Sequence, residues 1–365
     1  MKKIELIGKP KVIMSNRMSL HNYFAWPSVI RLQNGKIAAA ASGFRLNHVC
    51  PFGKAVIAFS EDNGETYTAP IPVIDTVLDD RDAGLCTFGE SGLIVTSFNN
   101  TIAQQKIWNK ELSMPDNIRA YREAYLDNIT EEQQNKVIGS TFRISNDCGV
   151  TFGDLHISPV TSPHGPIELK DGTVLWVGRI FNENQDFENE KNTLPVIQAH
   201  KINPDGSMEL VGCIPDISNR NSSHEPYTVE LDDGMLITQI RYHRPEWGMT
   251  IYQSVSKDSG KTWSEPVPII EGQNQDAPSH ILKHSSGTLV MTYGHRETPC
   301  GVRIAFSDDN GKTWDSGYTL SKSFDTDCGY PMSAELDDGS IITVYYSKDN
   351  ENEPCEIRQQ KWRFD

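Results

Sequence analysis

Short apolar runs separated by polar turns repeat along the whole chain. Six of them end in a glycine-containing turn, and a second apolar run follows each turn. The six copies read PSVIRLQNG, GLCTFGESG, PIELKDG, PYTVELDDG, PSHILKHSSG and PMSAELDDG, with turn glycines Gly35, Gly92, Gly172, Gly234, Gly287 and Gly339. Runs of this length between glycine turns are typical of paired β-strands. The pattern therefore predicts six β-hairpins.

A second repeat marks the turn after the third strand in four of the six copies. It has the pattern Ser-x-Asp-x-Gly-x-Thr-aromatic and spans residues 60–67, 145–152, 256–263 and 307–314. In such a turn Ser and Asp bind the local backbone, and Gly accepts a positive φ. A hairpin, a third strand with this turn and the next strand after it build a four-stranded antiparallel sheet. The chain is therefore predicted to be all-β, a six-bladed propeller whose radial closure protects most sheet edges.

We expect a single domain over residues 1–365, because no linker interrupts the repeats. The strand around residues 11–14 is expected to complete the last blade. Residues 100–136 interrupt blade two with a helical pattern that has good helix formers and no internal Gly or Pro after residue 115. A smaller polar insertion covers residues 182–192.

Charge and cysteine content indicate which partners and which cellular compartment to expect. The 365 residues carry a formal net charge of −15, which argues against nucleic acid and anionic membranes as partners. No apolar stretch reaches the ~18 residues that span a bilayer, and the N-terminal segment lacks the apolar core of a secretory signal. The seven cysteines include no CxxC pair. We therefore expect reduced thiols in a cytoplasmic protein, with the oligomeric state left open.

The boxed turns and the blade plan resemble the sialidase (neuraminidase) superfamily of BNR/Asp-box repeat propellers, and the resemblance covers nearly the whole chain. It implies an exo-glycosidase that acts on a glycoside or oligosaccharide. Members of this family bind the sugar carboxylate with three arginines. A Tyr serves as nucleophile with a Glu as its base, and an Asp serves as acid/base.

The innermost strand of each blade is expected to start at the central channel, where ligands bind. The residues at these six starts are Ala25-Trp26, Asp82-Ala83, His164-Gly165, His224-Glu225, Asp276-Ala277 and Gly329-Tyr330. Tyr330, in DCGYPMSAELDDG, resembles the segment that carries the family nucleophile. Glu225, in HEPYTVELDDG, matches the family base. A free phenol has a pKa near 10 and needs such a base to attack at neutral pH.

Three arginines are candidates for holding the sugar. Arg241 follows Glu225 by 16 residues, as in the family. Arg296 precedes the last boxed turn, where the third family arginine lies, and Arg45 resembles the arginine of a family segment in blade one. The planar guanidinium suits bidentate binding of a carboxylate.

Two departures from the family pattern bear on the substrate. Ala25 stands where the first arginine is expected, and Tyr346 stands where the family has the Glu that steadies it. The usual acid/base Asp is also missing after Arg45. His48 stands in that stretch, while Asp82 and Asp276 are other candidates for the acid.

The remaining polar and aromatic residues at the strand starts are expected to contact the sugar. His164, His224 and Asp276 can hydrogen-bond to hydroxyl groups, and Trp26 can stack on a sugar face. The spacing of the histidines is not diagnostic of a metal site, so that no metal and no cofactor is expected.

We expect a retaining exo-glycosidase with Tyr330 as nucleophile, Glu225 as base and Asp82 or His48 as acid. Its glycone would be terminal sialic acid or, given Ala25, a related acidic or deoxy sugar. Two alternatives stay open: a carbohydrate lyase that uses histidines or a metal, and a glycan-binding propeller without catalysis.

Overall fold

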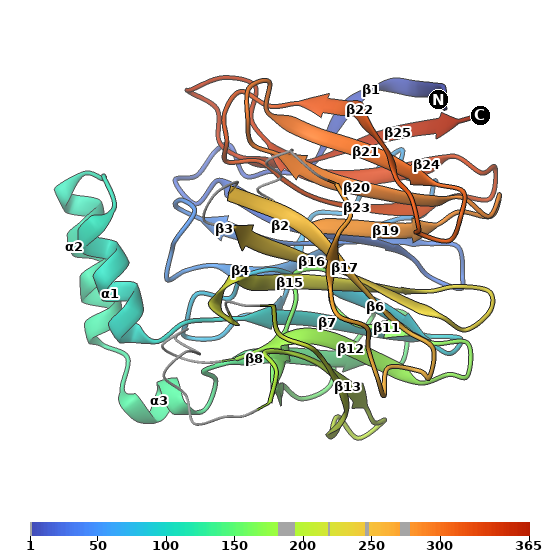
Figure 1. Cartoon of the computed structure of the whole chain (residues 1–365). Helices are drawn as coiled ribbons and strands as arrows, with labels where there is room; N and C mark the ends of the chain where they lie inside the picture. The colour runs from blue at the N-terminus through green and yellow to red at the C-terminus, as the bar shows by residue number, and fades with distance from the viewer. Residues whose placement is uncertain (1, 182–193, 218–219, 245–247, 271–277) are drawn as a thin grey trace.

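The chain folds into a ring of antiparallel sheets. A computed structural model describes residues 2–181, 194–217, 220–244, 248–270 and 278–365, and these residues form six sheets (Figure 1). The predicted six-bladed all-β propeller is therefore confirmed. The predicted polar insertion at residues 182–192 lies outside the described residues.

The first three blades follow the order of the chain. Blade one contains β2 (Tyr23–Arg31), β3 (Ile37–Arg45), β4 (Lys54–Ser60) and β5 (Ile71–Ile74). Blade two contains β6 (Leu85–Phe88), β7 (Gly92–Phe98), β8 (Ser140–Ser145) and β9 (His156–Ser158). Blade three contains β10 (Val160–Thr161), β11 (Ile167–Glu168), β12 (Val174–Ile180), β13 (Ile197–Ile202) and β14 (Met208–Ile214), where β10 and β11 both pair with β12.

The last three blades repeat this plan and close the ring. A short 3₁₀ helix (Arg220–Ser222) precedes blade four, which contains β15 (Ser223–Glu230), β16 (Leu236–Arg244), β17 (Gly248–Ser256) and β18 (Val267–Pro268). Blade five contains β19 (Ser279–Lys283), β20 (Leu289–His295), β21 (Gly301–Ser307) and β22 (Asp315–Lys322). Blade six contains β23 (Gly329–Glu335), β24 (Ile341–Ser347), β25 (Glu356–Phe364) and, from the other end of the chain, β1 (Ile4–Met14).

The two ends of the chain meet in blade six. β1 pairs antiparallel with β25, from Ile4 opposite Phe364 to Met14 opposite Ile357, and Figure 1 shows both termini on the same side of the ring. The prediction that an N-terminal strand completes the last blade is confirmed. The pairing covers the outer edge of β25 and joins the first residues to the last.

Apolar side chains fill the space between neighbouring blades. One buried cluster joins Phe24 and Ile37 of blade one to Met332 and Val344 of blade six. Comparable clusters lie between the other neighbouring pairs of sheets. Because each sheet packs on both sides, the ring holds the inner strands in fixed positions around a common centre, here called the hub.

The four boxed turns share one set of hydrogen bonds. In the turn after β4, the Ser60 hydroxyl donates to Asp62 at 2.8 Å, and the Gly64 N–H donates to Ser60 Oγ at 2.9 Å. Asp62 also accepts from the N–H and the hydroxyl of Thr66. The same bonds recur after β8, β17 and β21. These turns fix the path of the chain at the third strand of each of these blades.

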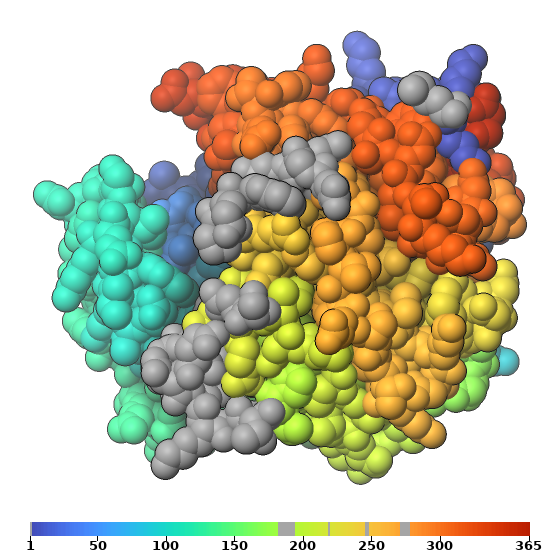
Figure 2. All heavy atoms as spheres, in the orientation of Figure 1, coloured from blue at the N-terminus to red at the C-terminus, as the bar shows by residue number. Residues whose placement is uncertain are grey.

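Within the described part of the chain, three helices interrupt blade two between β7 and β8. They are α1 (Ile102–Glu111), α2 (Asp116–Asp127) and α3 (Glu131–Asn135). They protrude from one side of the ring (Figures 1 and 2), and the predicted helical insertion is confirmed. Tyr121 and Tyr125 of α2 pack on Phe52, with ring centroids 4.9 and 4.7 Å apart. The insertion therefore touches the loop after β3.

Two further observations concern membrane-spanning helices and disulfide bonds. No helix in the described ranges combines the length and the apolar character needed to cross a bilayer. All seven cysteines lie in these ranges, and each is free of a disulfide.

Candidate active site

Four residues occupy equivalent, strained positions at the start of the innermost strands. Trp26, Asp82, Glu225 and Tyr330 have φ values of 51, 48, 50 and 48°, and Gly165 has 84° at the same place in blade three. A positive φ is unfavourable for residues other than glycine and persists where the surrounding structure holds it. Register shifts in the sheet accompany Trp26, Glu225 and Tyr330. Such bulges re-aim a side chain out of the regular alternation of the strand.

Tyr330, Glu225 and Arg241 form a hydrogen-bonded triangle across two blades. The Tyr330 hydroxyl donates to Glu225 Oε1 at 2.5 Å, and Arg241 Nη1 donates to Glu225 Oε2 at 2.6 Å. Arg241 Nη1 also lies 3.2 Å from the Tyr330 oxygen. The sheet places Arg241 there because it pairs with His224, the neighbour of Glu225. The structure thus brings together the three residues that the sequence suggests for attack and its support.

The triangle sets the protonation of its members. Burial acts to raise the pKa of Glu225, but the charge of Arg241 and the bond from Tyr330 outweigh it and leave this pKa below its usual value. Burial and the nearby Glu225 charge raise the pKa of Tyr330. Glu225 is therefore an ionised acceptor beside a phenol that still carries its proton. This is the arrangement of a base next to an unactivated nucleophile.

Asp82 stands across a cavity from Glu225 and has a different protonation behaviour. Burial raises the pKa of Asp82 to about 7, the Arg81 charge acts against this, and the Glu225 charge adds to it. Two carboxyl groups that face one cavity thus hold their protons over different pH ranges. Such a pair suits one carboxyl as base and the other as proton donor near neutral pH.

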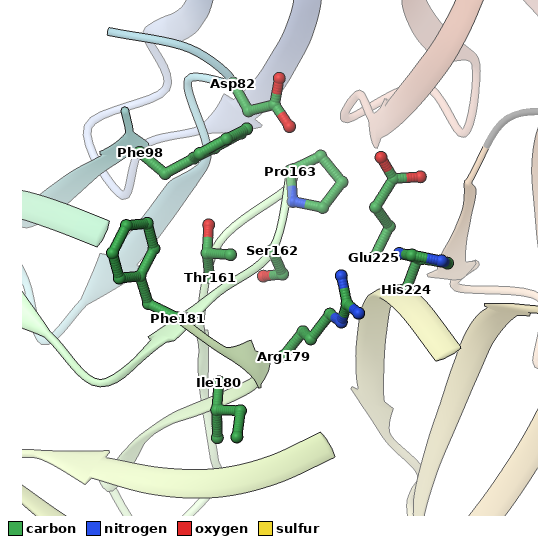
Figure 3. Close-up of a pocket in the computed structure, with 10 residues that line it drawn as sticks. All are labelled: Asp82, Phe98, Thr161, Ser162, Pro163, Arg179, Ile180, Phe181, His224 and Glu225. Carbon is green, nitrogen blue, oxygen red and sulfur yellow. The ribbon is translucent and has the colours of Figure 1, made fainter. Parts of the chain in front are cut away.

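The cavity has a polar side and an apolar side. Figure 3 shows Asp82, Glu225 and Arg179 directed toward the open space, with Phe98 and Phe181 opposite Glu225 and Arg179. Its lining residues are Asp82, Phe98, Thr161, Ser162, Pro163, Arg179, Ile180, Phe181, His224 and Glu225. Burial lowers the pKa of His224 to about 3, so that its imidazole is neutral here.

Arg296 approaches Tyr330 from blade five. Its guanidinium carbon lies 5.7 Å from the centre of the Tyr330 ring. Its Nη2 donates to the Tyr346 hydroxyl at 3.0 Å and to the carbonyl oxygen of Cys328 at 3.1 Å. Arg296 therefore belongs to the surroundings of Tyr330, although part of its hydrogen-bonding capacity is used by the protein.

Arg45 lies elsewhere than its expected role requires. Its side chain has no exposed surface and forms an ion pair with Asp79, which is equally buried, at 2.6 Å. Its other donors bind Ser42 and the carbonyl oxygen of His48. The expectation that Arg45 contacts the sugar needs correction, because a ligand would have to break this buried pair to reach it.

Two other expected sugar contacts are buried in packing. Trp26 is 1% exposed, and the guanidinium carbons of Arg45 and Arg81 lie 4.8 and 4.3 Å from its ring centre. His164 is also 1% exposed and packs edge-on against Tyr227, with ring centroids 5.8 Å apart. Neither side chain is placed to stack on or bind a sugar. Asp276 lies outside the described residues.

Asp327 and Arg179 are site residues that the sequence reasoning missed. Asp327 accepts hydrogen bonds from the hydroxyls of Tyr23 and Tyr346 and from Nδ1 of His48, at 2.8, 3.0 and 3.0 Å. It lies three residues before Tyr330. Arg179 lines the cavity from the second strand of blade three. An inspection of the second strand of each blade would have found Arg179, because the second strand of blade four supplies Arg241 in the same way.

Side chains of the kinds that bind metal ions are dispersed over the part of the chain that the structure describes. Among the residues that the structure describes, no three His, Cys, Asp or Glu side chains are grouped so as to hold a metal ion.

The chain is similar to a known protein family. The family described as BNR repeat-like domain matches residues 127–343. The chain belongs to this family. It is thereby a member of the sialidase/BNR propeller superfamily, as its repeats suggest.

Individual relatives of this BNR repeat-like protein are remote. A sialidase from Clostridium perfringens is 24% identical in an alignment of 207 residues, gaps included, that covers 47% of this chain and 52% of the relative. The match thus spans about half the length of that curated relative.

Solved structures share the fold over almost the whole chain. A protein of unknown function from Dyadobacter fermentans has a TM-score of 0.74 at 19% identity, with 99% of each chain covered. The NanB sialidase of Streptococcus pneumoniae has 0.62 at 12% identity, covering 97% of this chain and 70% of the other. The intramolecular trans-sialidase of Ruminococcus gnavus has 0.60 at 14%, with 95% of each chain covered.

Proposed function

We propose that this protein is a retaining, exo-acting glycoside hydrolase of the sialidase type. The observation that carries the proposal is the 2.5 Å hydrogen bond from Tyr330 to Glu225, with Arg241 in contact with both groups. The names of the sialidase and trans-sialidase relatives support a carbohydrate substrate. The fold alone is compatible with many activities, whereas these side chains are specific to the proposed chemistry.

In the first step, the Tyr330 oxygen attacks the anomeric carbon of the terminal sugar. Glu225 takes the phenol proton, and the bond from the anomeric carbon to the leaving oxygen breaks. Asp82 gives its proton to that oxygen, and a glycosyl–Tyr330 intermediate forms. A tyrosine nucleophile is a known exception to the two-carboxylate scheme of retaining glycosidases.

In the second step, a water molecule attacks the anomeric carbon from the side that the leaving group vacated. Asp82, now ionised, takes a proton from the water. The bond to the Tyr330 oxygen breaks, and Glu225 returns the phenol proton. The two displacements leave the anomeric configuration unchanged.

Asp82 suits the acid role better than His48. Burial lowers the pKa of His48, so that the ring is neutral near pH 7. Asp327 is ionised and can only accept, so that its 3.0 Å contact with Nδ1 places the ring proton there. The neutral ring then carries a lone pair on Nε2 and has no proton there to donate. Asp82, with a pKa of about 7, still carries its proton in a large share of molecules.

A panel of aryl glycosides, including a sialoside, tests the proposal. We expect NMR of the first-formed product to show retention of configuration. A fluorinated, activated glycoside of the accepted sugar is expected to add one glycosyl unit to the protein, on the peptide that contains Tyr330. Tyr330→Phe should lose this adduct and at least about 10²-fold in kcat, because the variant lacks the attacking oxygen.

Tyr227→Phe is the matched control. Tyr227 is a buried hub tyrosine that packs on His280, with ring centroids 4.5 Å apart, and its loss of one hydroxyl should leave turnover intact. An inverted first product, or full turnover by Tyr330→Phe, would exclude the covalent mechanism. Tight sugar binding without turnover across the panel would favour a glycan-binding propeller.

A further inference from the structure

The helical insertion in blade two has no part in the proposed mechanism, but it closes a second cavity. This insertion cavity has a volume of about 440 Å³. Four parts of the chain line it: residues 16–21 before β2, residues 44–54 around the loop after β3, residues 75–76 after β5, and Tyr125 of α2. Sites for small molecules have volumes of ~300–1,000 Å³, so that the insertion cavity is large enough to hold a ligand.

Hydrogen bonds fix the insertion against the blades and so fix the walls of the cavity. Arg122 of α2 has no exposed surface, and its Nη1 donates to the side-chain oxygen of Asn47 at 3.1 Å. One turn later in the same helix, the Tyr125 hydroxyl donates to the carbonyl oxygen of Val77 at 3.1 Å. The Tyr125 ring is therefore held in place at the edge of the cavity.

Aromatic rings form one part of the lining. Phe52 packs on Tyr125 and on His21, with ring centroids 4.7 and 5.3 Å apart, and Phe44 belongs to the same lining. Such rings offer flat apolar faces on which the C–H face of a pyranose can pack. By contrast, the cavity beside Phe88 has only that one aromatic ring in its lining. The concentration of rings thus distinguishes the insertion cavity.

Polar groups form the other part of the lining, and their charges balance. Lys54 and Asp75 pair with each other at 2.5 Å. The Asn16 amide donates to the carbonyl oxygen of His21 and leaves its own side-chain oxygen as an acceptor. The Ser19 hydroxyl accepts from the N–H of His21 and keeps its proton to donate. The lining therefore offers both donors and acceptors, while its one cation already faces a carboxylate.

This composition favours one class of ligand over two others. A phosphate or another anion requires positive charge, but the charge of Lys54 is already balanced by Asp75. An acyl chain would remove water from this ion pair and from Asn16 without replacing their hydrogen bonds, which costs free energy. A neutral sugar has an apolar C–H face for the rings and hydroxyl groups that both donate and accept.

We propose that the insertion cavity is a second carbohydrate-binding site, which holds a neutral pyranose unit of an oligosaccharide without cleaving it. The sugar ring packs on Phe52 and Tyr125, and its hydroxyl groups bind Asn16, Ser19 and the neighbouring ion pair. The site is distinct from the active site, because the two cavities share no lining residue. The helical insertion thereby gains a role in holding the substrate chain.

Ligand-observed NMR titration of the intact chain tests the inference. The probes are five neutral oligosaccharides: lactose, cellotriose, maltotriose, xylotriose and mannotriose. We expect at least one of them to bind. Tyr125→Leu should weaken this binding about tenfold, the upper end of what one aromatic contact contributes, and leucine is compatible with the helix. Tyr125→Phe is the matched control, since it keeps the ring, and its affinity should stay within about threefold of the parent.

A second variant removes a ring from another part of the lining. Phe52→Leu should also weaken the binding about tenfold, and urea unfolding shows whether each variant is folded. Binding of none of the five probes, or an affinity that survives the loss of either ring in a folded variant, would overturn the inference.

Glu225→Gln separates this site from the active site. The substitution removes the proposed base, but it should leave the affinity for the oligosaccharide unchanged. Conversely, Tyr125→Leu should leave kcat and KM unchanged on a small aryl glycoside. An affinity that falls with Glu225→Gln and not with Tyr125→Leu would place the sugar in the active site alone and refute the second site. Binding needs no turnover, so that failure of the proposed catalysis would leave these affinities valid.

Discussion

Replacement of Asp82 by Asn probes the proton donor of the proposed reaction. Asp82 is 6% exposed, and burial raises its pKa to about 7. An ordinary aspartate, with a pKa near 3.9, is protonated in fewer than about one molecule in 1,000 at pH 7. At a pKa of about 7, about half of the molecules hold the proton at that pH. Burial thus supplies the acid form several hundred times more often.

The expected kinetic loss depends on the leaving group. A positioned acid contributes about 10²–10⁴-fold, so that Asp82→Asn should lower kcat/KM by about 10²-fold or more on alkyl glycosides of the accepted sugar. The phenol of an activated aryl glycoside is acidic enough to leave without protonation. On such substrates the loss of kcat/KM, which reports glycosylation, should stay within about fivefold. For the unaltered protein, kcat/KM on alkyl substrates should fall as pH rises through about 7, the pKa of Asp82.

The same variant has a predicted effect on stability. The unfolded chain ionises Asp82 near its ordinary pKa, whereas the folded chain ionises it only near 7. The stability that the proton on Asp82 contributes is therefore fully present below the unfolded pKa and is lost as the pH rises toward 7. For about three pKa units the loss is up to about 4 kcal/mol. Asp82→Asn should be more stable than the parent at pH 7, with a gap that closes toward pH 4.

Two measurements check these effects. Initial rates of matched alkyl and aryl glycosides from pH 5 to 9 give the kinetic part, and urea unfolding from pH 4 to 8 gives the stability part. Equal losses on both substrates would refute the acid role. An alkaline decline that persists in Asp82→Asn, or a stability gap that does not vary with pH, would refute the raised pKa of Asp82.

Three further predictions concern the scaffold, and urea unfolding monitored by tryptophan fluorescence checks each of them. Asp79→Asn should lose about 3–5 kcal/mol, because it leaves the buried Arg45 guanidinium without its partner; a loss under about 1 kcal/mol would contradict the ion pair as described. Ser60→Ala should lose about 1–3 kcal/mol, since the buried Gly64 N–H loses its acceptor, and an unchanged midpoint would show that another acceptor replaces it. Gly84→Ala should destabilise the chain or prevent its folding, because the new Cβ would lie 2.5 Å from a backbone nitrogen of blade three; wild-type stability would mean that blades two and three can separate.

The repeats by themselves determine the fold, because strand length, turn chemistry and alternation are local properties. Each hairpin and each boxed turn forms from residues close in sequence, and six copies leave little choice of architecture. The same regularity locates Asp82, Glu225 and Tyr330, since they begin equivalent strands. The resemblance to the sialidase superfamily then assigns them expected roles.

Contacts between blades are decided only by the closed ring. Tyr330 and Glu225 are 105 residues apart, and the distance between them follows from how six sheets pack around one centre. Arg45 shows the limit of prediction from the sequence. Its position along the chain fits a residue that contacts the sugar, but in the folded chain it forms a buried ion pair with Asp79. Asp327 is the opposite case: nothing near it in sequence signals that Tyr23, His48 and Tyr346 converge on it from blades one and six. Burial, which sets the pKa of Asp82, is likewise a property of the assembled ring, because neighbouring blades remove the water around it.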